Sequence, residues 1–215
     1  MDDLVTVESS ERLRELIGEV GERARRKVRP RLDADDRRWL QASSLCFVAT
    51  SDGQGRCDAS PKGDPAGSLV HILDDSTIAI AERPGNRRVD GYFNILDNPH
   101  VGMVFVVPGR SDVLRVNGKA LLVEDAPWFE ALEVNGKRPV LALLVQIEEV
   151  FGHCAKALVR AQAWHPETWR PGEVTDVSAS ARERRAQGLR DLADGITSVE
   201  ELEQAQVSSY SAPLY

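Results

Sequence analysis

Two short segments carry polar residues whose types and spacing could bind an anion. In the first, every second residue is polar, so that in a strand four side chains would share one face: Arg56, Asp58, Ser60 and Lys62. The second, residues 82–88, reads Glu-Arg-Pro-Gly-Asn-Arg-Arg, a turn in which Asn86 is predicted to cap the next helix. Guanidinium groups beside a helix start make a good phosphate site. We expect a phosphate at the second segment and a ligand along the first. The alternative for the first segment is that its polar face is simply exposed to solvent.

The overall charge argues against a nucleic-acid or membrane partner, so any anion must meet a local basic cluster. The chain has 215 residues and a formal charge of −7, the wrong sign for binding nucleic acid or an anionic membrane through bulk charge. A basic run over residues 23–31 could be a nucleic-acid arm, but cations at a helix end are ordinary and the acidic composition favours that interpretation. The apolar runs are too short to span a membrane, and the acidic start is unlike a signal peptide. We expect a cytoplasmic protein.

No known catalytic signature occurs in the sequence, which lacks GxSxG, P-loop, GxGxxG and HExxH patterns. The three cysteines, Cys46, Cys57 and Cys154, form no CxxC pair and are expected to be reduced, inert thiols of the core, Cys46 in its apolar strand above all. His153 and Cys154 are adjacent, and adjacent strand residues point to opposite faces, so no metal site is expected. The sequence therefore identifies no catalytic residues, which stay unknown.

The elements that must position these residues follow from hydrophobic periodicity. It predicts a helix over residues 9–27, ended by Pro30, and a second helix from an Asp33 cap through Leu40. Strands are predicted over residues 44–50, 56–60, 69–73, 77–81, 101–107, 113–123 and 139–151. Helical inserts are predicted at 87–96 and 127–133, and further helices at 178–194 and 198–206.

Many strands with few helices between them imply a mainly β fold with helical additions, an antiparallel sheet closed into a barrel. The expected organisation is an N-terminal helical extension over 1–32, a barrel domain over 33–168 and a polar, helical C-terminal tail over 169–215.

Four stretches in the middle of the chain carry a family resemblance. They are the strand Arg-x-x-x-Ser-Pro-Lys ending at Lys62, the turn Ile-Ala-Glu-Arg-Pro-Gly-Asn-Arg-Arg ending at Arg88, residues 94–105 and residues 114–120. The chain resembles the pyridoxamine 5′-phosphate oxidase-like family, the FMN-binding split β-barrels, over about residues 33–165. Within it, the chain looks most like a bacterial subgroup expected to use FMN. The resemblance implies a homodimer with FMN at the interface.

The same resemblance implies which residues bind the cofactor. Residues on the strand along the flavin are Arg56, Ser60, Pro61 and Lys62. Those at the ring edge and the phosphate are Ile80, Ala81, Asn86, Arg87 and Arg88. Residues expected to reach the flavin from the second subunit, or to contribute besides, are Arg115, Asn117, His153, Lys156 and Trp164. A cation such as Lys62 or Arg115 would stabilise negative charge on the reduced ring.

The expected function is that of an FMN-dependent oxidoreductase, passing hydride or electrons between a small organic substrate and a nicotinamide, such as NAD(P)H, or oxygen. Two alternatives stay open: a non-catalytic module that binds flavin or haem on the same barrel, and a deazaflavin-dependent reductase. Oxidation of pyridoxamine phosphate itself is not expected, because the name-giving enzyme binds its substrate with an Arg-x-His near the C-terminus and this sequence has none.

Overall fold

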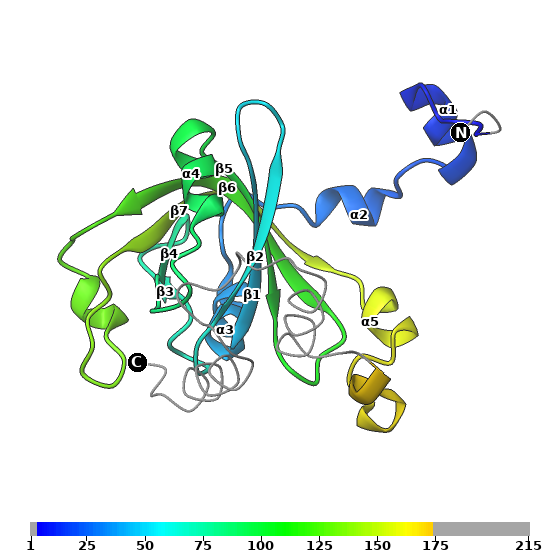
Figure 1. Cartoon of the computed structure of the whole chain (residues 1–215). Coiled ribbons are helices and arrows are strands. Elements are labelled where there is room, and N and C mark those ends of the chain that lie inside the picture. The colour runs from blue at the N-terminus through cyan, green and yellow to red at the C-terminus, as the bar shows by residue number, and fades with distance from the viewer. Residues whose placement is uncertain (1–3, 174–215) are drawn as a thin grey trace, which may run out of the picture.

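The computed structural model describes residues 4–173, whose centre is one sheet of seven strands. Every neighbouring pair is antiparallel, and the order is β2-β1-β5-β6-β7-β4-β3. The strands are β1 Leu45–Ser51, β2 Cys57–Gly63, β3 His71–Ile72, β4 Thr77–Ala81, β5 His100–Val106, β6 Val113–Val123 and β7 Ala142–His153. The sheet curves strongly around its core (Figure 1). The predicted mainly β, antiparallel fold is confirmed.

Short helices connect and flank the strands. The α-helices are α1 Ser10–Ile17, α2 Glu22–Arg26, α3 Ala34–Ala42, α4 Asp90–Asp97 and α5 Lys156–Arg160. The 3-10 helices are η1 Phe129–Leu132, η2 Pro166–Thr168 and η3 Pro171–Glu173. Within residues 4–173, no helix is long and apolar enough to span a membrane.

The core lies on the inner face of the sheet. Along β6 and β7 buried and exposed side chains alternate, as the period of two in the sequence predicted. Leu40 of α3 is fully buried beside Phe105 and Val116, so this helix covers one end of the core. Cys46 is also fully buried, as expected, whereas Cys57 and Cys154 are exposed and do not belong to the core.

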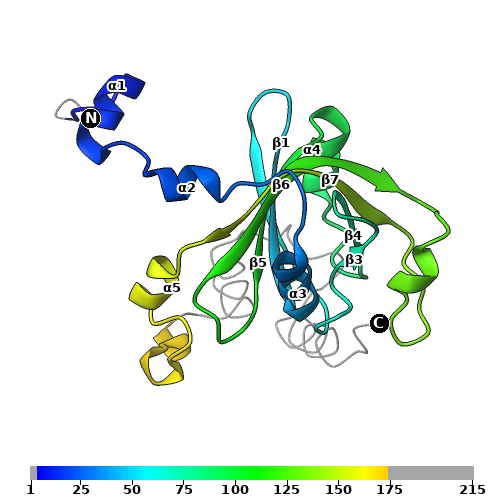
Figure 2. The ribbon, with the colours of Figure 1, turned by 180° about the vertical axis from the view of Figure 1, so that it is seen from behind.

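The N-terminal region differs from its prediction. The single helix expected over residues 9–27 is two helices, because the chain turns at Gly18 with φ +87°. Ser9 caps α1 as predicted, but no residue of α1 or α2 is buried. Both views show this arm extending away from the sheet (Figures 1 and 2). Short helices without packing gain little from propensity alone, so nothing compensates for the break at the glycine.

Two other helix starts test the capping predictions. The Asp33 cap of α3 is confirmed, and Asp36 completes a capping box. Asn86, however, does not cap α4, which begins at Asp90 with Val89 in the cap position. Asn86 instead accepts a hydrogen bond from the backbone N–H of Arg88 at 2.9 Å. The predicted helix start therefore lies three residues too early.

Two more segments, one predicted as a strand and one as a helix, differ from their predictions. The strand expected over residues 69–73 is reduced to His71–Ile72, and the insert at 127–133 is a 3-10 turn. The helices expected at 178–194 and 198–206 lie outside the described residues.

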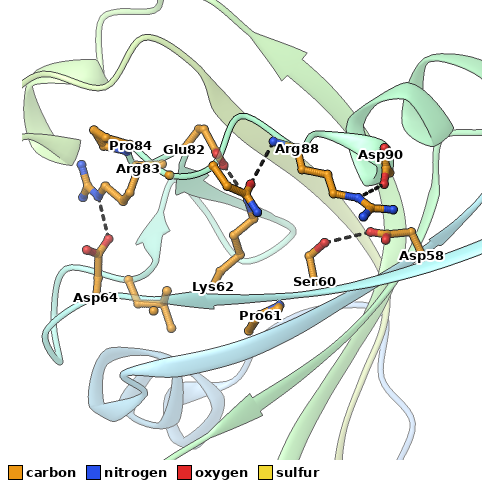
Figure 3. A pocket seen from close by; sticks show the side chains of 15 residues that line it. Asp58, Ser60, Pro61, Lys62, Asp64, Glu82, Arg83, Pro84, Arg88 and Asp90 are labelled. Atoms are coloured by element: carbon orange, nitrogen blue, oxygen red, sulfur yellow. Dashed lines mark hydrogen bonds and ion pairs between the residues drawn. The ribbon is translucent and has the colours of Figure 1, made fainter. Parts of the chain in front are cut away.

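The sheet has two free edges, which decides where a ligand can lie. Strands β2 and β3 are the outer strands, and within the described part of the chain they do not pair with each other. The segment 82–89, between β4 and α4, lies near β2 (Figure 3). The barrel is thus split between β2 and the β4 side.

Candidate functional site

A cavity of about 360 Å³ lies at this split, between β2 and the turn that follows β4. Its wall is made by β2 with Asp64, by Leu69, and by residues 81–86 together with Arg88 and Asp90. The side chains labelled in Figure 3 are Asp58, Ser60, Pro61, Lys62, Asp64, Glu82, Arg83, Pro84, Arg88 and Asp90. The volume falls in the range of small-molecule and cofactor sites. Two segments singled out in the sequence therefore meet at one cavity.

Strand β2 presents its polar residues to this cavity as the period of two predicted. Asp58, Ser60 and Lys62 are half-buried, while the residues between them are exposed. Ser60 Oγ donates to Asp58 Oδ2 at 2.8 Å. Asp64 continues the same spacing one step further and lines the cavity too, a residue that the sequence analysis missed although the pattern reaches it. Arg56 lies before the strand and outside the cavity.

Lys62 belongs to a network of three residues, of which Lys62 and Glu82 line the cavity and Tyr92 lies behind them. Its Nζ pairs with Glu82 and donates to the Tyr92 hydroxyl at 3.0 Å, and that hydroxyl donates to the Glu82 carboxylate. The ammonium also lies 4.7 Å from the centre of the Tyr92 ring. Burial, followed by the Glu82 carboxylate, raises the pKa of Tyr92 and keeps it protonated. The charge of Lys62 is therefore balanced by Glu82.

Arg83 and Asp64 form a buried clamp between the turn and the end of β2. Arg83 Nε donates to Asp64 Oδ2 at 2.8 Å, and its Nη1 donates to the Leu132 carbonyl at 3.0 Å. The two side chains are only 14% and 2% exposed. Removing one partner of such a pair would leave a buried charge, so this contact fixes the turn rather than serving a ligand.

Arg88 is held much more loosely. Its Nε donates to Asp90 Oδ2 at 2.5 Å, but the two side chains are 78% and 45% exposed. Asp90 raises the pKa of Arg88, so this guanidinium stays charged. Exposed ion pairs contribute little to stability, so Arg88 can exchange its partner for a ligand at small cost.

The electrostatics of the cavity differ from the purely basic clusters that the sequence suggested. Three cations, Lys62, Arg83 and Arg88, face four carboxylates, which leaves one net negative charge. The carboxylates are Asp58, Asp64, Glu82 and Asp90. Each of the three cations has a carboxylate partner. Asp58 and Glu82 lie in the two segments singled out in the sequence, whereas Asp64 and Asp90 lie just beyond them and were not predicted as part of the site.

The structure divides the predicted cofactor residues into two groups. Those that line the cavity are Ser60, Pro61, Lys62, Ala81, Asn86 and Arg88. Ile80 is buried in the core beside it, and Arg87 lines a second cavity on the other side of the turn. Arg56 is bound to Asp52, its Nε donating at 2.5 Å.

The residues expected from a second subunit lie on other surfaces of this chain. Arg115 and Asn117 point to the outer face of β6, where Arg115 lies 4.9 Å from the Phe151 ring centre and Asn117 donates to Glu149 at 2.8 Å. His153 ends β7 and Lys156 begins α5. Trp164 Nε1 donates to the Arg110 carbonyl at 2.7 Å.

Several solved structures are similar to part of this chain. Solved structures similar to it include HupZ from Group A Streptococcus, with 23% identity, a TM-score of 0.45 and coverage of 56% of this chain and 93% of that one. A protein assigned as a candidate pyridoxamine 5′-phosphate oxidase of Lactobacillus delbrueckii has 25% identity, a TM-score of 0.45 and coverage of 57% and 95%. HutZ, the haem storage protein of Vibrio cholerae, has 17% identity, a TM-score of 0.40 and coverage of 56% and 94%.

A search of curated proteins finds no match. The sequence profile of one family, described as pyridoxamine 5′-phosphate oxidase, matches residues 32–154. That match spans more than half of the chain, all seven strands and the whole cavity wall at the split. The chain therefore belongs to the pyridoxamine 5′-phosphate oxidase family.

Proposed function

We propose that this chain is a flavoprotein that binds FMN in the cavity at the split of the barrel and acts as an oxidoreductase. One observation carries the proposal: the polar face of β2 and the Arg88 turn, predicted separately as an anion site, form one cavity of about 360 Å³ within the family-matched segment. Leu69 and Ala81 add buried apolar surface to the same wall, as a flat aromatic ring requires.

The donor set fits a phosphate at one end of the cavity. Arg88 is charged and exposed, its partner Asp90 is exposed as well, and the Ser60 hydroxyl lies on the facing strand. A guanidinium binds a phosphate with two parallel hydrogen bonds, which is stronger than an exposed ion pair. Arg88 would thus hold the phosphate after leaving Asp90, while the Arg83–Asp64 clamp keeps the turn in place.

Bound FMN would supply two-electron chemistry, accepting a hydride from a small organic donor or a reduced nicotinamide and passing two electrons to an organic acceptor or oxygen. The chain's own residues bind and orient the cofactor and set the charge around it. The paired charges of Lys62 and Glu82 form part of the cavity wall, so each one's removal would change the field at the ligand. No side-chain nucleophile is needed for this chemistry.

We further propose a homodimer with FMN at the interface. The outer face of β1 and β2 supports an interface, because Phe47 is 45% exposed and lies opposite the exposed Pro61 in the sheet register. A second copy could then bring Arg115 and Asn117 from its β6 to the cofactor, as the family resemblance implies.

The haem alternative is less well supported by the cavity. Iron in haem proteins takes an axial ligand from His, Cys, Met or Tyr. None of the described residues that line the cavity is of these types. A deazaflavin would use the same phosphate and ring contacts as FMN. The residues that line the cavity therefore fit both cofactors.

The test is the visible spectrum of the purified full-length protein, followed by release and chromatographic identification of the bound chromophore. We expect flavin absorption bands and FMN as the released compound. A Soret band would support the haem module and a released deazaflavin the deazaflavin reductase, and either would overturn FMN. A colourless protein that does not bind added FMN would also overturn the proposal.

A further inference from the structure

A second cavity, of about 440 Å³, lies on the other side of the turn that closes the first. The two cavities share residues 82–85 as a common wall. The opposite wall of the second cavity is residues 137–141, which lead into β7. The proposed FMN site makes no use of this space.

Most of its surface is apolar. Pro84, Val89, Leu141 and the buried ring of Tyr92 form the walls, and Val140 stands at the rim with 82% of its surface exposed. A valine exposed to this degree beside a cavity of this volume offers an apolar molecule a large contact area. The cavity therefore suits the apolar body of a small ligand.

The cations that line this cavity outnumber its carboxylates. Glu82 is neutralised by Lys62 and Arg83 by Asp64, both through the first cavity. Arg138 pairs with Asp125 and lies 4.7 Å from the Phe129 ring centre. Arg87 and Lys137 also line the cavity, and no ion pair joins either one to a carboxylate in the described part of the chain. Two cations without a carboxylate partner among the described residues thus lie beside an apolar wall, in contrast to the first cavity, where each cation has one.

The backbone conformation at Arg87 directs its side chain and that of Arg88 into different cavities. Its φ is +63°, in the left-handed region that side chains other than glycine adopt at a cost in free energy. The turn holds Arg87 in the second cavity and Arg88 in the first. Strain of this kind is commonly found where the surrounding structure serves a ligand.

We propose that the second cavity is a binding site for a small molecule with an apolar body and one anionic group, such as a carboxylate, a sulfonate or a phosphate. The apolar body lies against Val89, Tyr92 and Leu141, and Arg87 and Lys137 bind the anionic group. Neither of these two cations lines the first cavity, although the two cavities share residues 82–85 as a wall.

A pair of fluorescent probes that differ by the anionic group alone tests this site. 1-Anilinonaphthalene-8-sulfonate carries a sulfonate, and N-phenyl-1-naphthylamine is the same molecule without it. Both are titrated into the full-length protein, with and without saturating FMN. We expect the wild type to bind the sulfonate probe about tenfold or more tightly than the neutral probe, with the same preference whether or not FMN is bound.

The double substitution Arg87→Gln and Lys137→Gln should weaken the sulfonate probe about tenfold and leave the neutral probe unchanged. The matched control is Arg38→Gln with Lys119→Gln, which removes one exposed arginine and one exposed lysine elsewhere. Val140→Asp, at an exposed position, should weaken the sulfonate probe by placing a negative charge at the rim. Arg88→Gln should leave the sulfonate probe unaffected.

Equal affinity of the wild type for the two probes would overturn the proposal. So would a loss for the Arg87 and Lys137 variant no larger than that of the control pair, or a loss caused by Arg88→Gln instead. If the double variant does not fold, as judged by circular dichroism, the Val140→Asp titration decides. Failure to bind FMN would contradict the proposed function while leaving this comparison of probes intact.

Discussion

Arg87 and Arg88 are adjacent in the chain, yet their side chains line two different cavities on opposite sides of one turn. Arg88 lies at the split of the barrel and is bound to Asp90 at 2.5 Å, whereas Arg87 faces the segment that carries Lys137. A pair of arginines that the sequence suggests as one phosphate clamp is therefore divided between two cavities of one chain. We propose that Arg88 binds the phosphate in the first cavity and that Arg87 binds an anionic group in the second.

The Lys62–Glu82 pair should influence the reduction potential of a bound flavin. Glu82→Gln leaves the Lys62 charge unbalanced and should raise the reduction potential of bound FMN, because reduction adds negative charge to the ring. Lys62→Gln should lower it. A shift of roughly 30 mV, about 1.4 kcal/mol for a two-electron couple, is the expected size. Spectroelectrochemical titration measures both, and shifts of the same sign in the two variants would contradict this role.

The three cysteines should react at different rates. Burial raises the pKa of Cys46 to about 12, so this thiol is protonated and shielded at neutral pH. Cys57 and Cys154 are exposed. In the native protein an aromatic disulfide reagent should therefore titrate two thiols quickly and the third only after unfolding. Rapid reaction of all three would show that the β1 region is open in solution.

The bulge in β6 makes Gly118 sensitive to substitution. A Cβ added there would lie 2.1 Å from the Gln146 carbonyl oxygen of β7, and the register shifts between Asn117 and Gly118. Gly118→Ala should lower the free energy of unfolding by roughly 1–3 kcal/mol or more, as overpacking does. Gly152→Ala, in β7 with open space around it, is the matched control and should change it little. Urea titrations of the two variants compare them, and equal stability would contradict the described register.

The Asp33 cap of α3 predicts a dependence on pH. A hydrogen bond from the backbone of Asp36 has the largest effect and lowers the pKa of Asp33; burial opposes it, and the charge of Arg29 lowers the pKa further. The carboxylate therefore stabilises the fold above its unfolded pKa of about 3.9, and this stability is lost as the pH falls through the lower folded value.

Replacement of Asp33 checks this. Asp33→Ala should lower the free energy of unfolding by about 1 kcal/mol at neutral pH, and Asp33→Asn, which can still cap, by less. Both variants should lose less stability than the wild type between pH 5 and pH 2. Identical acid unfolding of all three proteins would show that the cap contributes nothing.

Sequence reasoning was most successful where local pattern decides structure. Strands β4 and β6 were predicted to the residue, because alternation bounded by turns defines them. The Asp33 cap was equally local. The long N-terminal helix failed because its apolar stripe has no partner in the described structure, and without packing Gly18 ends the helix.

The sequence predicted the basic residues of the candidate site but not the carboxylates with which they pair. The basic residues stand out in the sequence, but their partners come from elsewhere: Glu82 reaches Lys62 across 20 positions and Asp64 reaches Arg83 across 19. Which carboxylate neutralises which cation depends on how β2 meets the turn after β4, and no local spacing encodes that. Asp64 alone could have been found, by extending the alternation of β2 by one step.

The most direct test of the central claim compares the binding of FMN and riboflavin to the wild type and to Arg88→Gln, since the two ligands differ only in the phosphate. Quenching of flavin fluorescence gives each affinity, and Arg110→Gln, an exposed arginine paired with Asp112 outside the cavity, is the control. We predict that Arg88→Gln weakens FMN roughly tenfold or more and leaves riboflavin and the control unchanged. An equal loss for both ligands, or no loss for either, would contradict the assignment of this cavity as the FMN site.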